Sequence, residues 1–129
     1  MLKKHKYVII LAVVSLLTHF LYYGHPNETV FDEVHFGKFI SGYFTHEYFF
    51  DIHPPLGKLI ISGMGYLTGF KPGFSFAEIG QSFPDQQYFW LRLLPTLAGT
   101  ILPLIIFWLS LRLGIPRFGA LTAGIFVAL

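Results

Sequence analysis

Two short stretches of this sequence hold the residues that could do acid–base chemistry. Residues 30–37 (VFDEVHFG) contain an Asp–Glu pair, and residues 49–58 (FFDIHPPLGK) contain an Asp and a His before two prolines. Carboxylates are costly to bury, so acids placed among apolar residues usually serve a function. A solvated loop is the simpler explanation for an isolated Asp–Glu pair. Because these acids alternate with bulky apolar residues, we favour a half-buried polar site.

The composition is that of a membrane protein. The 129 residues are 53% hydrophobic, 19% aromatic and 12% charged, about half the charged fraction of an ordinary soluble domain. The net charge of +2 is too small to indicate a nucleic-acid partner, and the lack of cysteine excludes disulfides and thiolate metal sites. All seven acids lie between residues 24 and 90. Five bases lie outside this interval, beside apolar runs: Lys3, Lys4, Lys6, Arg112 and Arg117.

This charge distribution predicts the membrane segments and their orientation. Residues 7–23 follow the N-terminal lysines and form an apolar run long enough to span a bilayer, which predicts a transmembrane helix. No small-residue cleavage site follows, so we do not expect a signal peptide. Residues 91–111 predict a second transmembrane helix, and residues 118–129 the start of a third. The positive-inside rule then places the N-terminus and residues 112–117 in the cytoplasm, and residues 24–90 in an extracytoplasmic loop.

We expect two amphipathic helices within this loop; the first lies along the membrane surface, and the second is either interfacial or re-entrant. The second covers residues 56–70, between the double proline and a loop over residues 71–87. The first begins at the Asp–Glu pair, and its apolar residues recur at helical spacing with small and polar residues on the other side. The apolar set is Phe36, Phe39, Ile40, Tyr43 and Phe44, and the other side carries Lys38, Ser41, Gly42 and Thr45.

Four motifs occur in the order found in one enzyme family. They are residues 30–37, residues 48–58, Ile79-Gly80 and residues 91–95 (LRLLP). The chain resembles the N-terminal part of the protein O-mannosyltransferases, the dolichyl- or polyprenyl-phosphate-mannose–protein mannosyltransferases. The resemblance covers nearly the whole chain, and its two central motifs are long and specific. The chain departs from the family pattern at His19, where many relatives carry Arg.

The resemblance implies both a fold and an activity. The fold is an all-α polytopic membrane protein of the C-class glycosyltransferase type, whose first external loop carries the acidic pair of the active site. The activity is inverting transfer of mannose from polyprenyl (dolichyl)-phosphate-mannose to Ser or Thr of acceptor proteins at the extracytoplasmic face, without a cofactor. The resemblance places such a protein in the plasma membrane of a bacterium or the endoplasmic reticulum membrane of a eukaryote, and it is compatible with a dimer.

The chemistry of this transfer suggests roles for the polar residues. A hydroxyl that attacks a sugar C1 needs a base, and a partly buried carboxylate can serve. Asp32 is the predicted base, and Glu33 would orient it or hold the acceptor. The anionic leaving group needs cationic or N–H donors, which His53, Lys58 and Arg92 could supply. Snorkelling to the interface explains Lys58 equally well, and interfacial anchoring explains Arg92 equally well. The candidates for substrate binding are His35, Asp51, His53, Lys58 and Arg92.

Several alternatives stay open. Asp32, His35, Asp51 and His53 are residue types that suit a metal ion, although the resembled family does not depend on one. A related C-class enzyme could move another sugar or glycosylate a lipid, but residues 53–58 (HPPLGK) favour the protein mannosyltransferase. The chain could also be a truncated, non-catalytic membrane homologue. Because the last apolar run spans only ~18 Å of a ~30 Å hydrocarbon core, we expect an N-terminal fragment that is inactive alone.

Overall fold

The computed structural model describes residues 2–129, with side chains from residue 5 onward. Over this range the chain forms five α-helices, and outside them the structure has turns, loops and an isolated β-bridge. The all-α expectation is therefore confirmed. The chain divides into two compact units. We call them the bundle unit, which contains the N-terminal residues up to Tyr23 and Pro95–Leu129, and the loop unit, which is Gly24–Leu94.

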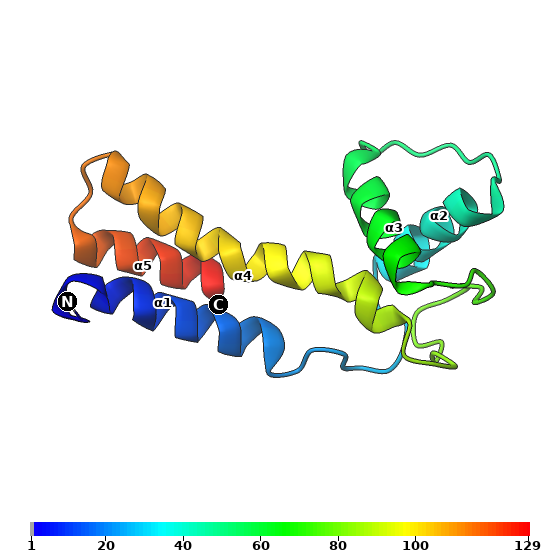
Figure 1. The fold of residues 1–129 in the computed structure, drawn as a ribbon, viewed down its shortest axis with the longest axis horizontal. Coiled ribbons are helices and arrows are strands. Elements are labelled where there is room, and N and C mark those ends of the chain that lie inside the picture. Colours follow the sequence, from blue (N-terminus) through cyan, green and yellow to red (C-terminus); the bar gives the residue numbers. More distant parts are fainter. Residues whose placement is uncertain (1) are drawn as a thin grey trace. The chain divides into compact units, whose positions relative to one another are not determined.

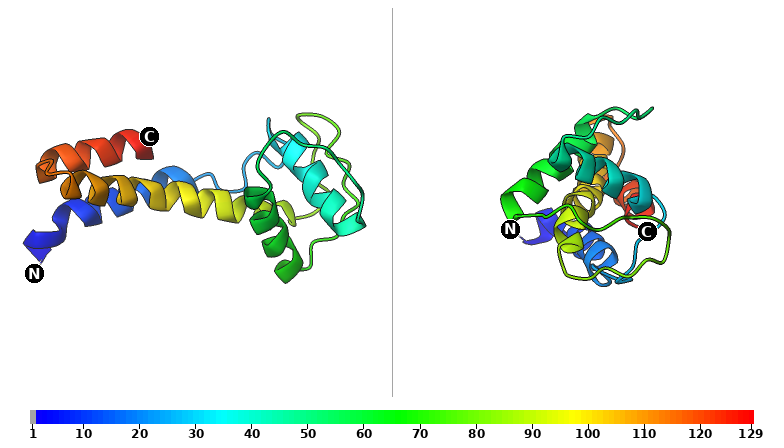
Figure 2. Two further views of the ribbon diagram at one scale, coloured as in Figure 1. Left: turned by 90° about the horizontal axis from the view of Figure 1, so that it is seen from above. Right: turned by 90° about the vertical axis from the view of Figure 1, so that its right-hand side faces the viewer.

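Three helices make up the bundle unit. Helix α1 (Leu2–Phe20), the later part of α4 (Tyr88–Arg112) and α5 (Arg117–Ala128) lie side by side in Figures 1 and 2. The Ser15 hydroxyl of α1 donates a hydrogen bond of 2.8 Å to the Thr100 carbonyl of α4. Their shared apolar cluster is formed by Leu11, Phe107, Ala120, Leu121 and Ala128.

The apolar helices differ in length. Among the described residues, α4 is the one helix long and apolar enough to cross a membrane, and the apolar parts of α1 and α5 are shorter, at His5–Phe20 and Arg117–Ala128. Helix α4 begins at Tyr88, earlier than the expected residue 91, and it continues through Pro95 and Pro103. Proline is tolerated inside a membrane helix where neighbouring groups satisfy the carbonyl that it leaves unpaired.

Helix α1 ends at Phe20, before the expected residue 23. Leu21 and Tyr23 continue the chain as a turn, with their N–H groups donating to the carbonyls of Leu17 and Phe20. Gly24 then takes a φ of +87°, the left-handed conformation that ends a helix most easily at glycine. The end of α1 is therefore set by the backbone conformation near Gly24, which the apolar periodicity of the sequence does not predict.

Two helices pack against each other in the loop unit (Figure 1). Helix α2 (Glu33–Thr45) begins at the acidic pair, with Asp32 as its N-cap residue. Helix α3 (Leu56–Thr68) begins directly after the double proline and ends at Gly69, whose φ of +74° lets its N–H close onto the last turn. Both loop helices expected from the sequence are thus confirmed as helices.

An aromatic core ties the loop over residues 71–87 to α2. The Phe74 ring lies 4.8 Å from the rings of both Phe76 and Phe83. Phe76 covers Gly37 of α2 so closely that a Cβ atom on this glycine would lie 2.2 Å from the ring. The buried members of the core are Ile40, Phe70, Phe76, Phe83 and Tyr88.

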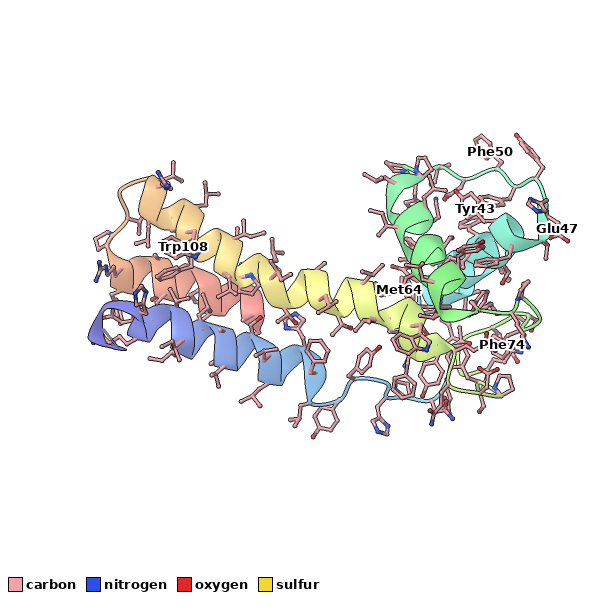
Figure 3. The ribbon with its side chains drawn as sticks, viewed as in Figure 1. Tyr43, Glu47, Phe50, Met64, Phe74 and Trp108 are labelled. Carbon is pink, nitrogen blue, oxygen red and sulfur yellow. The ribbon has the colours of Figure 1, made fainter. Side chains whose placement is uncertain are left out.

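The side of α2 that the sequence predicted to be polar is only partly exposed to solvent. Gly42 is buried beneath Phe49, and the Ser41 hydroxyl is buried as well. Figure 3 shows Tyr43 on α2 with Glu47 and Phe50 on the segment that follows the helix. This segment folds back over the helix and covers Gly42, and the helical pattern placed both Gly42 and the Ser41 hydroxyl opposite the apolar residues. The apolar residues of α2 likewise contact protein, at Phe39–Phe49, Tyr43–Phe49 and Phe44–Phe70.

Candidate active site

The acidic pair lies at the first turn of α2. The Asp32 carbonyl accepts the N–H groups of His35 at 3.0 Å and Phe36 at 2.9 Å, which begins the helix. The Asp32 carboxylate makes no side-chain capping hydrogen bond, and the side chains of Asp32 and His35 are both exposed. A helix N-terminus favours a negative charge. Asp32 is therefore an accessible carboxylate at the start of α2, and not the partly buried one that the sequence led us to expect.

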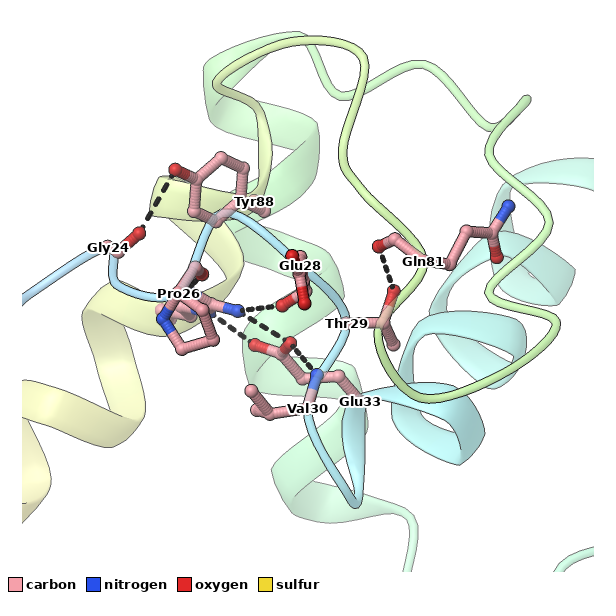
Figure 4. Close-up of polar contacts among 9 residues, drawn as sticks. Gly24, Pro26, Glu28, Thr29, Val30, Glu33, Gln81 and Tyr88 are labelled. Carbon is pink, nitrogen blue, oxygen red and sulfur yellow. Dashed lines mark hydrogen bonds and ion pairs between the residues drawn. The ribbon is translucent and has the colours of Figure 1, made fainter.

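Glu33 is held in place by Arg92, which lies 59 positions later in the chain. The Arg92 Nε donates to Glu33 Oε1 at 2.5 Å, and Nη2 donates to Oε2 at 2.8 Å. Glu33 Oε2 also accepts the N–H of Val30 at 2.9 Å, as Figure 4 shows. Bidentate pairing of a guanidinium with a carboxylate fixes both groups in one orientation.

The remaining donors of Arg92 bind the backbone of the segment that enters α2. Nη1 donates to the Pro26 carbonyl and Nη2 to the Glu28 carbonyl, both at 2.8 Å. The guanidinium lies over the rings of Tyr88 at 4.7 Å and Phe83 at 5.6 Å, which leaves the Arg92 side chain 13% exposed. Arg92 thus joins the start of α4 to the residues that precede α2.

Backbone pairing places the same entering segment against residues 79–83. Thr29 donates its N–H to the Gln81 carbonyl at 2.9 Å and accepts the Gly80 N–H at the same distance. The Thr29 hydroxyl also donates to the Gln81 carbonyl, and the Tyr88 hydroxyl donates to the carbonyl of Gly24 (Figure 4). The Ile79-Gly80 motif therefore lies where the chain returns to support the acidic pair.

Asp51, His53 and Lys58 form a second polar group. Asp51 Oδ1 accepts the His53 N–H at 3.1 Å and lies 2.9 Å from His53 Nδ1, while Asp51 Oδ2 pairs with Lys58 Nζ. Lys58 Nζ also donates to the His53 carbonyl at 3.3 Å and lies 5.0 Å from the centre of the Phe39 ring. The His53 ring centre is 6.4 Å from that of Phe36.

The structure therefore sorts the seven sequence-predicted site residues into three sets. Glu33 and Arg92 form one ion pair, Asp51 and Lys58 form another with His53 attached, and Asp32 and His35 are exposed on the first turn of α2. Within residues 5–129, no group of three or more His, Asp or Glu side chains is arranged to hold a metal ion.

Sequence reasoning missed the groups that surround Arg92. The carbonyls of Pro26 and Glu28 have no side-chain signal, because any residue could supply them. Tyr88 does have one, since it precedes Arg92 by four residues and helical residues at this spacing lie on one face. An aromatic residue one helical turn before Arg92 is thus the sequence feature that could have indicated the stacking.

A model of the family described as dolichyl-phosphate-mannose-protein mannosyltransferase matches residues 9–129. The chain belongs to the dolichyl-phosphate-mannose–protein mannosyltransferase family. This confirms the resemblance carried by the sequence motifs, and the family is one of membrane proteins that act in protein O-glycosylation.

Individual relatives agree with this assignment. Protein O-mannosyltransferase 1 of Drosophila pseudoobscura pseudoobscura is 38% identical over 92% of this chain and 13% of its own length. Mannosyltransferase 4 of Candida albicans is 40% identical over 96% of this chain and 17% of its own length. A chain in the Saccharomyces cerevisiae Pmt1–Pmt2 complex bound to the sugar donor is 38% identical, with a TM-score of 0.86 over 99% of this chain. The present chain spans 18% of that mannosyltransferase chain.

Proposed function

We propose that the protein transfers mannose from a polyprenyl-phosphate-mannose donor to Ser or Thr hydroxyls of proteins, with Asp32 as the base. The observation that carries this proposal is the contrast between neighbouring acids. Glu33 is bound by Arg92 and by the Val30 N–H, whereas Asp32 is exposed and makes no side-chain cap. Among the described side chains, Asp32 has no ion-pair partner. It is the acid of the pair that is free to accept a proton.

The proposed reaction is a single displacement. The acceptor oxygen forms a bond to C1 of mannose, the bond from C1 to the phosphate oxygen breaks, and the polyprenyl phosphate leaves with the electron pair. Asp32 accepts the hydroxyl proton as the new bond forms, and one such step inverts the configuration at C1. General bases of this kind contribute about 10²–10⁴-fold to the rate.

The other site residues have supporting roles in this proposal. Glu33 and Arg92 fix the turn that carries Asp32, and Glu33 helps to hold the acceptor peptide. His35, Asp51, His53 and Lys58 belong to the donor side of the same site, which adjoins the first turn of α2. The relative of known structure is part of a Pmt1–Pmt2 complex, so we also propose that this protein acts as a dimer.

We further propose a C-class fold with residues 7–23, 91–111 and 118–129 in the membrane and the loop over residues 24–90 on the extracytoplasmic side. The segregation of acids from the flanking bases supports this orientation. Cysteine introduced at Ser75 should react with a membrane-impermeant thiol reagent in sealed vesicles of outside-out orientation, and cysteine at Arg117 should not. Reversed labelling would contradict the orientation.

The catalytic proposal is tested by Asp32→Asn in membranes from cells that express the full-length gene product. We expect the transfer of labelled mannose to a Ser/Thr peptide to fall about 10²–10⁴-fold, because the near-isosteric amide cannot accept the proton. Donor binding should stay nearly intact. The matched variant Glu33→Gln should lose less turnover, since its role is positional.

Two outcomes would count against this assignment. If Asp32→Asn keeps near-normal turnover while Glu33→Gln is inactive, the roles of the two acids must be exchanged. If neither change matters in a folded protein, the pair only begins the helix and the catalytic proposal for this turn fails.

A further inference from the structure

We propose that Asp51 and Lys58 are positioning residues for His53, whose Nε2 atom binds the phosphate group of the lipid-linked donor. This inference rests on the proposed mannosyl transfer and deepens it, because it separates the residue that meets the phosphate from those that hold it. Three observations carry it: the hydrogen bonds within residues 51–58, the contrast in burial among the three side chains, and the place of His53 beside α2.

The hydrogen bonds fix both the backbone and the ring of His53. One oxygen of Asp51 faces the His53 N–H at 3.1 Å and the ring Nδ1 at 2.9 Å. The other oxygen of Asp51 pairs with Lys58 Nζ, which also donates to the His53 carbonyl at 3.3 Å. Pro54 and Pro55 follow, and each has a fixed φ. The segment therefore has little freedom to move the imidazole.

Burial divides the three residues by role. The side chains of Lys58 and Asp51 are 2% and 8% exposed, whereas that of His53 is 61% exposed. A buried ion pair gives little net stability against an apolar pair of the same volume, so its value here lies in the geometry that it imposes. Lys58 is too deeply buried to contact a phosphate, and the exposed functional group that this segment offers is the imidazole.

The partner of Nδ1 determines what Nε2 can do. An ionised carboxylate can only accept hydrogen bonds, so Nδ1 carries the hydrogen that points to Asp51. Nε2 is then the outward-facing ring atom. In an imidazolium both ring nitrogens carry a hydrogen, so an Nε2–H can donate a charge-assisted hydrogen bond to a phosphate oxygen. The cations Lys58 and Arg92 of the same unit are already paired with Asp51 and Glu33.

The position of His53 relates it to the proposed base. Its ring lies 6.4 Å from that of Phe36, and Phe36 donates its N–H to the Asp32 carbonyl one turn earlier. Side chains on a helix tilt toward its N-terminus, so the Phe36 ring covers the turn that Asp32 begins. The titratable groups in contact with His53 are Asp51 and Lys58 of its own segment, and Asp32 and His35 lie on the first turn of α2, to which Phe36 belongs. Phosphate at His53 and a hydroxyl at Asp32 would bind at the same end of α2.

The test compares three substitutions of His53 in the full-length protein. His53→Ala should raise the KM for polyprenyl-phosphate-mannose about ten- to hundredfold, the range expected for a hydrogen bond to a charged group, with a smaller change in kcat. His53→Gln carries an N–H near the position of Nε2 and should recover most of this loss. His53→Asn carries one near Nδ1 and should not. His46→Asn, at another exposed histidine, is the matched control and should leave both constants unchanged.

The role of Asp51 is tested in a double-mutant cycle. Asp51→Asn should raise the donor KM in the wild-type background and have almost no further effect in the His53→Ala background, because its influence passes through the ring. Equal effects on the KM in both backgrounds would show that Asp51 acts independently of His53 and would overturn its positioning role. If Asp51→Asn fails to fold, the contrast between His53→Gln and His53→Asn still decides whether Nε2 binds the donor.

These outcomes separate the inference from the function on which it rests. An unchanged donor KM in an active His53→Ala enzyme, or equal behaviour of the Gln and Asn variants, would overturn the inference and leave mannosyl transfer intact. Absence of transfer by the wild-type protein would instead overturn the proposed function. Displacement of a bound fluorescent polyprenyl phosphate by unlabelled polyprenyl phosphate measures affinity without turnover. In this competition assay the affinity should still fall in His53→Ala and recover in His53→Gln. Unchanged competition would overturn the inference as well.

Discussion

The two ion pairs of the loop unit differ in reach and in burial. Glu33 and Arg92 are 59 positions apart in the sequence, and their side chains are 23% and 13% exposed. Asp51 and Lys58 close one short segment, and their side chains are 8% and 2% exposed. The first pair holds distant parts of the chain together, whereas the second fixes the shape of a single loop.

The choice of cation follows from these surroundings. Arg92 has a planar fork of donors, which allows one side chain to bind a carboxylate and two backbone carbonyls at once. Lys58 ends in a compact ammonium group that fits under the Phe39 ring and meets one carboxylate and one carbonyl. In both cases the cation is used to place another residue, and Asp32 and His53 are left as the exposed groups.

Breaking the buried pair should have the largest effect on stability. Lys58→Met removes the cation and leaves Asp51 charged and almost fully buried, so we expect a loss of about 3–5 kcal/mol in the free energy of unfolding. Chemical denaturation of the purified protein in detergent measures it. Lys71→Met, at an exposed lysine of the same unit, should change stability by less than about 0.5 kcal/mol. A loss of similar size in both variants would show that burial of the pair does not matter.

Weakening the long-range pair should have a smaller effect. Arg92→Lys keeps the charge but cannot reproduce the fork that reaches Glu33 and the Pro26 and Glu28 carbonyls, so we expect a loss of about 2 kcal/mol. Hydrogen exchange should also become faster at the Thr29 and Gly80 amides, which pair the entering segment with residues 79–83. Arg112→Lys, at the exposed end of α4, is the control. Unchanged exchange at these amides would mean that Arg92 does not hold the segment.

The smallest effect is expected from Glu33→Gln. The amide oxygen can still accept hydrogen bonds from Arg92 Nη2 and the Val30 N–H, but the NH2 group cannot accept from Arg92 Nε and the charge assistance is lost. We estimate the loss at about 1 kcal/mol. Because Glu33 is more exposed than Asp51, this difference should shrink as the salt concentration rises. The loss caused by Lys58→Met should stay nearly constant over the same range. Denaturation curves at low and high salt compare the two variants, and equal salt dependence would remove the distinction between the pairs.

Local features of the fold could be read from the sequence. The acidic pair begins α2 and the double proline precedes α3, because the preference for acids at a helix N-terminus and the geometry of proline are both local properties. The end of α1 and the start of α4 each lie three residues before the predicted positions, near Gly24 and at the aromatic residues before Arg92. The family was also evident, since its motifs are long stretches with fixed residue order.

The amino-acid sequence by itself therefore determined the helices, the family and the set of polar residues in the candidate site. Only the tertiary structure decided which of them are exposed. Arg92 and Lys58 have the residue types of phosphate ligands, yet their partners depend on how the chain folds back, and the same folding buries Gly42 beneath Phe49. Helical periodicity assigns a residue to a face of its own helix but carries no information about which other segment will cover that face.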